Sequence, residues 1–281
     1  MAIAIVCDST ADLPREIIKK YGIHVVPLKV HFGEEEYRDG VDISPQEFYK
    51  KMQASGILPT TSQPSPGEFA ESYHSILKEG KNTIISIHIS AHLSGTHRSA
   101  IVAKSMLPKA DIEIVDSKQA STVLGLIVLE AARAAKSGKT KGEVLSLVNE
   151  MVEKIRVFFM VDSLKYLEKG GRIGKAQAVL GSMLNIKPIL TLEEGIIVPA
   201  AKTRGRAKGI EQLLTRIQTN IGTGEQSLMG IMHAVEYDGM ENLKNKVKDK
   251  WQPQELIVSD IGPVIGTHVG PGTLALIGLK P

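Results

Sequence analysis

Short apolar runs alternate with helical stripes through the first half of the chain. Apolar runs predict strands at residues 3–7, 24–32, 83–90 and 112–116. Apolar residues three or four positions apart predict helices over residues 13–21, 69–77, 119–137 and 141–155. Because strands and helices alternate, we predict βαβ units on a mostly parallel sheet.

The second half of the chain has a different pattern. Strands are predicted at residues 157–162, 188–200, 227–234, 255–260 and 273–279. The stretch 188–200 is two apolar runs around Glu193-Glu194-Gly195, which indicates a hairpin. Helical stripes over 210–217 and 240–251 lie between the strands. We therefore predict an α/β protein of two domains: a parallel domain, 1–156, and an α+β-like domain with a substantially antiparallel sheet, 157–281.

Two helix starts in the first half have strong local signals. Ser44-Pro45-Gln46-Glu47 and Ser65-Pro66-Gly67-Glu68 each combine a capping hydroxyl, a proline in the first turn and an acid three residues after the cap. This combination is typical of a capping box. We expect helices to begin at Pro45 and at Pro66.

Composition narrows the function classes. Hydrophobic residues make up 42% and charged residues 23%, which favours a folded globular protein. A net charge of +3 with 4% aromatic residues gives no sign of nucleic-acid binding. No apolar stretch is long enough to span a membrane, and we find no signal peptide, so we expect a cytoplasmic protein without stable membrane insertion. The single cysteine, Cys7, reads as a buried core thiol.

The segment around Ser94 has the most specific pattern of the candidate sites. A strand ends near Ser90, Ala91-His92-Leu93-Ser94-Gly95 forms a turn, and a helix is expected to start near Thr96. Hydroxyls and backbone N–H groups at a helix start suit a carboxylate or a phosphate, whereas a plain helix cap is an equally good interpretation of this segment alone. A serine hydrolase is disfavoured because G-x-S-x-G is missing, and the nearby histidines lack the spacing of a metal site, so we predict none.

Four further segments carry candidate chemistry. Residues 58–69 gather hydroxyls among prolines, 169–176 gather glycines around Arg172, 201–208 form a basic loop with Arg204, and 259–276 form a glycine- and proline-rich loop around His268. Residues 169–176 fail as a phosphate-binding P-loop, since only three residues separate Gly170 from Gly174-Lys175 and Ala176 follows. Residues 58–69 and 201–208 also fit ordinary solvated loops, and His268 also fits a structural histidine.

Taken together, the segments resemble the DegV family, which includes the fatty-acid-binding subunits of bacterial fatty acid kinase. The resemblance rests on six motifs in the same order along nearly the whole chain. They are VCDSTADLP (6–14), YRDGVDI (37–43), PTTSQPSPGEF (59–69), SAHLSGTHRSA (90–100), EKGGRIG (168–174) and IGPVIGTHVGPG (261–272).

The resemblance implies two α/β domains with a long-chain fatty acid, such as hexadecanoate, between them. It implies that Thr61 and Ser94 hold the carboxylate, with Ser62 and His268 close by. It also implies that Arg172, Arg204 and His268 face a separate ATP-binding kinase subunit, so that the chain is a carrier with no catalytic residue and no cofactor. The rival interpretations are a Ser94-dependent hydrolase, a small-molecule kinase, and a sensor of another amphiphilic lipid.

Overall fold

A four-stranded parallel sheet forms the first part of the fold. The computed structural model describes residues 3–179 and 186–279. The strands, in their order across the sheet, are β2 (His24–Val26), β1 (Ile3–Asp8), β6 (Thr83–His88) and β7 (Asp111–Asp116). All three neighbouring pairs are parallel, which confirms the predicted βαβ arrangement.

The helices of this part start where local chemistry places them. They are α1 (Arg15–Tyr21), α2 (Pro45–Ser55), α3 (Pro66–Lys78), α4 (Thr96–Ser105), α5 (Thr122–Lys136) and α6 (Lys141–Lys154), with a short 3-10 turn η1 (Ser9–Ala11). Both predicted capping boxes are present at Ser44 and Ser65. A third box, between Thr140 and Glu143, starts α6. Helix α5 begins three residues later than predicted, after Ser121.

A six-stranded mixed sheet forms the second part. Its order is β10 (Ile196–Arg204), β9 (Ile186–Glu193), β8 (Ile155–Met160), β13 (Leu274–Leu279), β11 (Leu228–His233) and β12 (Glu255–Asp260). Only the β11–β12 pair is parallel, so the substantially antiparallel sheet and the 188–200 hairpin are confirmed. The helical segments of this part are α7 (Lys165–Lys169), η2 (Gly174–Val179), α8 (Arg206–Ile221), α9 (Tyr237–Trp251) and α10 (Pro263–Val269).

The prediction of one strand over residues 24–32 was wrong. After β2 the chain passes Pro27, which has no N–H for a sheet ladder, and then enters a separate strand, β3 (Lys29–Phe32). Strand β3 lies between β4 (Glu35–Arg38) and β5 (Thr60–Ser62) in a small antiparallel sheet. This small sheet places Thr61 and Ser62, as the site below requires.

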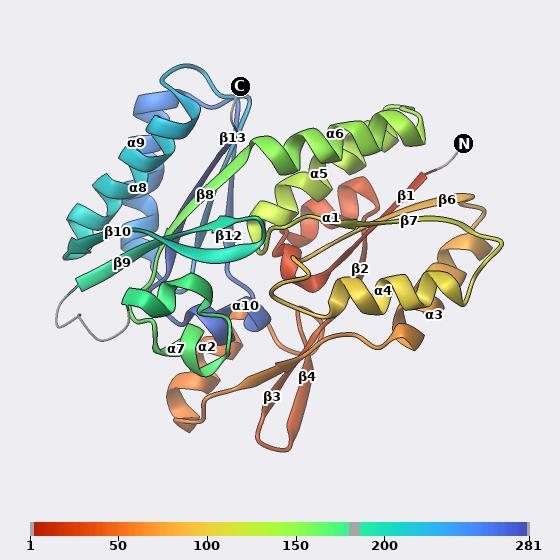
Figure 1. Ribbon diagram of the computed structural model, residues 1–281, viewed down its shortest axis with the longest axis horizontal. Coiled ribbons are helices and arrows are strands. Elements are labelled where there is room, and N and C mark those ends of the chain that lie inside the picture. Colours follow the sequence, from red (N-terminus) through yellow and green to blue (C-terminus); the bar gives the residue numbers. More distant parts are fainter. Residues whose placement is uncertain (1–2, 180–185, 280–281) are drawn as a thin grey trace.

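Helix α5 joins the two larger sheets. Figure 1 shows them side by side, with α8 and α9 on the outer side of the six-stranded sheet and the β3–β4 hairpin projecting below. Helix α5 packs against β1 of one sheet and β11 of the other. One buried hydrophobic cluster runs from Ile5 to Ile277, so the division at residue 156 stays a prediction. Within the described ranges, no helix is long and apolar enough to cross a membrane.

Candidate functional site

A largely apolar cavity lies where the two parts of the fold meet. Its volume is about 270 Å³, whereas a single buried water needs about 10–15 Å³. The apolar lining residues are Leu28, Ile89, Leu93, Ala120, Val123, Val157, Phe159, Leu167, Leu192, Ile197, Met232, Ile261, Val264, Ile265 and Val269. The polar lining residues are Thr61, Ser62, Gln63, Ser94, Ser121, Arg172, His268 and Thr273. A cavity lined in this way suits a mostly apolar ligand that also carries a polar group.

Ser94 reaches this cavity from the turn between β6 and α4, as the sequence predicted. The turn closes through backbone bonds from the N–H groups of Leu93 and Ser94 to the carbonyl of Ser90, at 2.9 and 3.1 Å. The Ser94 hydroxyl lies 2.8 Å from the Thr96 hydroxyl and accepts the Thr96 N–H at 3.3 Å. The Thr96 N–H, expected to face a ligand, is therefore already bonded.

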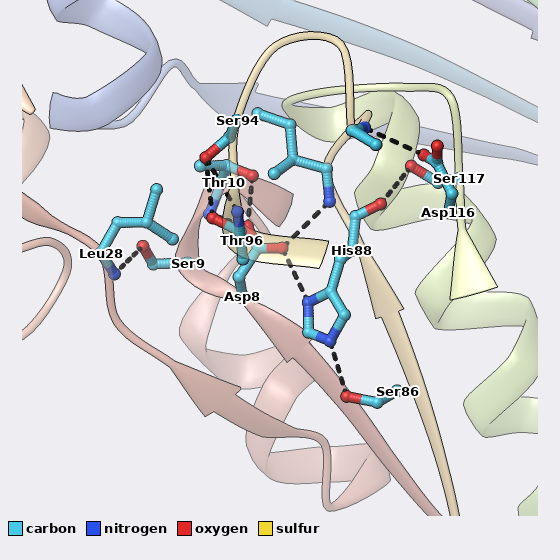
Figure 2. A network of polar contacts seen from close by, with 12 residues as sticks. Asp8, Ser9, Thr10, Leu28, Ser86, His88, Ser94, Thr96, Asp116 and Ser117 are labelled. Carbon is cyan, nitrogen blue, oxygen red and sulfur yellow. Dashed lines mark hydrogen bonds and ion pairs between the residues drawn. The ribbon is translucent and has the colours of Figure 1, made fainter. Parts of the chain in front are cut away.

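A buried hydrogen-bond network at the ends of β1 and β6 holds this turn (Figure 2). The Asp8 carboxylate accepts the Ile89 N–H at 3.0 Å and lies 3.0 Å from His88 Nδ1. On the other side of the ring, Tyr73 donates to Ser86 at 2.9 Å, and Ser86 lies 2.7 Å from His88 Nε2. Since all four side chains are fully buried, the network fixes where β6 ends and the Ser94 turn begins.

Strand β5 brings Thr61 and Ser62 to the same cavity. The next residue, Gln63, donates from Nε2 to the Ser99 hydroxyl on α4 at 2.9 Å. Its side chain crosses so close to Gly95 that a Cβ there would lie 2.0 Å from Gln63 Oε1, so a larger residue would displace the Gln63 amide. Gln63, which the sequence analysis did not single out, therefore joins the Thr61 segment to the Ser94 turn.

His268 also lies at the cavity, but not in a loop as predicted. It belongs to the last turn of α10. This helix begins at Pro263, and proline is favoured in a first helical turn. His268 Nε2 lies 2.9 Å from the Thr61 hydroxyl, and the buried Nδ1 of this ring has no hydrogen-bond partner among the residues that the structure describes. Burial, and then the positive charge of Arg172, lower the pKa of His268 to about 4. The imidazole is therefore neutral at physiological pH.

The structure places the two candidate arginines differently. Arg172 lines the cavity and donates to the backbone carbonyls of Leu93, at 3.0 Å, and Gly170, at 2.6 Å, so it ties the segment after α7 to the Ser94 turn. Arg204 ends β10, is exposed to solvent and does not line the cavity. Ser62 lines the cavity while its hydroxyl lies 2.9 Å from His31 Nε2.

The site has little of what hydrolysis or metal chemistry requires. Within residues 3–179 and 186–279, no histidine forms a hydrogen bond with Ser94 that could activate it as a nucleophile. Ser86, His88 and Asp8 do form a serine–histidine–aspartate chain, but Ser86 is fully buried beneath Tyr73 and cannot meet a substrate. The described residues contain no group of three or more His, Cys, Asp or Glu side chains suited to a metal ion.

Comparisons of the chain with a family model and with known proteins indicate the same family. A family model described as "Uncharacterised protein, DegV family" matches residues 2–280. A DegV domain-containing protein of Caldanaerobacter subterraneus is 39% identical over 270 residues, which cover 96% of this chain and 95% of the relative.

Two solved structures carry ligand information. A DegV family protein from Thermus thermophilus, described as fatty acid binding, has a TM-score of 0.94 and 36% identity and covers 100% of both chains. A stearic-acid-binding protein from Eubacterium ventriosum has a TM-score of 0.88 and 29% identity, over 99% of this chain and 98% of that one. These similarities establish that both the fold and the order of segments are shared along the whole length.

Removing the His88 side chain tests the buried network. We expect His88→Leu to lower the free energy of unfolding by roughly 3 kcal/mol, because Asp8 and Ser86 lose a buried partner. Urea unfolding followed by circular dichroism measures this. His74 on α3 is exposed, so His74→Leu is the matched control and is expected to change stability by less than about 0.5 kcal/mol. Equal effects of the two substitutions would contradict the role given to the network.

The low pKa of His268 predicts a specific pH dependence. The unfolded chain binds a proton at this residue near its usual pKa of 6.5, whereas the folded chain binds it only near pH 4. Stability from this residue is therefore present above about pH 6.5 and is lost as the pH falls toward 4, by about 3 kcal/mol. We expect His268→Gln to reduce the fall in unfolding free energy between pH 7 and pH 4. An unchanged pH profile in that variant would show that His268 is not the group responsible.

Proposed function

The chain belongs to the DegV family, and on that premise we propose that it binds a long-chain fatty acid, such as hexadecanoate, in the cavity between residues 1–156 and 157–281. Thr61 and Ser94 hold the carboxylate, and Ser62 and His268 lie beside it. The observation that supports this most directly is that Thr61 and Ser94 both line a cavity whose lining residues are mostly apolar.

The binding energy of a fatty acid divides between its apolar chain and its carboxylate. A sixteen-carbon chain removes about 15 apolar groups from water, at about 0.8 kcal/mol each, or on the order of 12 kcal/mol before ordering costs. A desolvated carboxylate needs donors, and a hydrogen bond to a charged acceptor contributes about 1.5–3 kcal/mol. The chain thus supplies affinity, and the hydroxyls at Thr61 and Ser94 set the orientation.

The second part of the proposal is that this cytoplasmic protein presents the carboxylate to a separate ATP-dependent kinase subunit, which forms the acyl phosphate. The sequence has no nucleotide-binding motif of its own, so phosphoryl transfer needs a partner. The Arg172 side chain donates to backbone carbonyls, so a carboxylate held by hydroxyls is not forced into a tight ion pair with it. Arg172, exposed Arg204 and His268 form the partner-facing surface.

Native mass spectrometry of the purified chain, followed by solvent extraction, tests the ligand. We expect one fatty acid per chain. The double variant Thr61→Ala, Ser94→Ala is expected to bind hexadecanoate at least about tenfold more weakly while keeping its circular dichroism spectrum, because the carboxylate loses two donors. Ser105→Ala, on the exposed end of α4, is the control. Extraction of a sterol or retinoid would replace the fatty acid in the proposal, and a covalent adduct on Ser94 would revive the hydrolase.

Separating affinity from presentation tests the partner role. We expect Arg204→Ala to reduce acyl-phosphate formation with the kinase subunit severalfold while the dissociation constant for the fatty acid stays within about twofold, since Arg204 lies outside the cavity. Lys109→Ala, an exposed cation on another loop, is the control. A matching loss of lipid affinity and acyl-phosphate formation would show that Arg204 acts on the fatty acid rather than on the partner.

A further inference from the structure

Thr96 has a hydroxyl group that the proposed function leaves without a role. It is the first residue of α4 and is fully buried. Within the part of the chain that the structure describes, its hydroxyl has one hydrogen-bond partner, Ser94 Oγ, at 2.8 Å. Figure 2 shows the two side chains facing each other beside the Asp8 network. Because a buried O–H without an acceptor is unfavourable, Thr96 must be the donor in this pair.

This assignment fixes what the Ser94 hydroxyl can do. A serine hydroxyl has two acceptor lone pairs and one donor hydrogen. The Thr96 hydroxyl occupies one lone pair and the Thr96 N–H, at 3.3 Å, the other. The Ser94 hydrogen is therefore left to point into the cavity that Ser94 lines. Ser94 can donate to a ligand but cannot accept from one.

We propose that Thr96 is a positioning residue that makes Ser94 an obligate hydrogen-bond donor, so that the site selects an ionised carboxylate over an alcohol of the same chain length. This inference rests on the proposed function, because it concerns the head group of the ligand assumed there. A carboxylate only accepts hydrogen bonds, whereas an alcohol also needs an acceptor for its own hydrogen.

The Thr61 hydroxyl, which also lines the cavity, is a donor for a similar reason. The His268 imidazole is neutral, and within residues 3–179 and 186–279 its buried Nδ1 has no partner. A proton on Nδ1 would leave a buried N–H unpaired, which is rarer in proteins than an unpaired acceptor. With the proton on Nε2, His268 donates to Thr61 across 2.9 Å, and the Thr61 hydrogen is free for the ligand. Both hydroxyls then act as donors.

The test compares hexadecanoate with hexadecan-1-ol on delipidated protein by calorimetry. The wild-type chain is expected to prefer the acid. Thr96→Val keeps the shape but removes the hydroxyl, so Ser94 regains an open lone pair. We expect its affinity for the alcohol to rise about tenfold, because Ser94 can now accept the hydrogen of the alcohol, while its affinity for hexadecanoate stays within about twofold. Thr96→Ser restores the hydroxyl and is expected to restore the wild-type preference.

Two further variants separate positioning from structure. Thr83→Val removes a buried hydroxyl that donates to Asp111 at the opposite end of β6, so it is expected to reduce stability without changing the ratio of acid to alcohol affinity. In the Ser94→Ala background, Thr96→Val is expected to change that ratio no further, since there is no hydroxyl left to orient. If Thr96→Val does not fold, Thr96→Cys replaces it, and its ratio should lie between those of wild type and Ser94→Ala because a thiol donates weakly.

The outcomes separate this inference from the proposed function. An equal loss of acid and alcohol affinity in Thr96→Val, or an unchanged ratio, overturns the role of Thr96 and leaves fatty-acid binding intact. A wild-type chain that binds neither ligand overturns the proposed function, and the inference with it. A lowered ratio in Thr96→Val that Thr96→Ser restores and Thr83→Val does not reproduce supports the inference.

Discussion

The carboxylate of Asp8 is the constraint on which the candidate site depends. It stands at the carboxyl end of β1, where it accepts the Ile89 N–H and meets His88. A buried carboxylate is costly unless its oxygens are paired, so the end of β6 cannot move away from it without a large loss of stability. The Ser94 turn begins one residue after that fixed point. Its geometry is therefore set by a network whose buried side chains do not line the cavity.

The segments that carry Thr61 and His268 are held at the site by close contacts with two glycines. Gln63 lies across Gly95 to reach Ser99, and the ring of His268 packs so closely on Gly170 that a Cβ there would lie 2.2 Å from Nδ1. A larger residue at Gly95 or Gly170 would separate the segments that carry Thr61, Ser94 and His268. Helix α5, packed on both larger sheets, contributes Val123 to the apolar lining of the cavity.

Holding the carboxylate with hydroxyls rather than with an ion pair suits the proposed role. A buried arginine paired with the carboxylate would hold it firmly and lower its reactivity, whereas Arg172 is engaged with two carbonyls. His268 adds no charge of its own at neutral pH. In the proposed role, the apolar chain provides retention and the hydroxyls of Thr61 and Ser94 provide orientation, which are the two properties that a carrier presenting a head group needs.

Much of the fold follows from the sequence alone, because its signals are local. The capping boxes at Ser44 and Ser65, the hairpin around Gly195 and the turn before Thr96 all depend on residues within a few positions of one another. The order of the six motifs likewise identified the family. By contrast, the pairing of β3 with β5 and the crossing of Gln63 over Gly95 depend on partners far away in the chain. The break at Pro27 and the helix that begins at Pro263 follow from local signals that the sequence patterns did not bring out. Sequence determined which residues carry hydroxyls and which segments are strands, since these are properties of neighbouring residues. Only the tertiary structure decided that Thr61, Ser94 and His268 share one cavity and that Thr96 is buried against Ser94, because burial and the choice of a hydrogen-bond partner are set by packing.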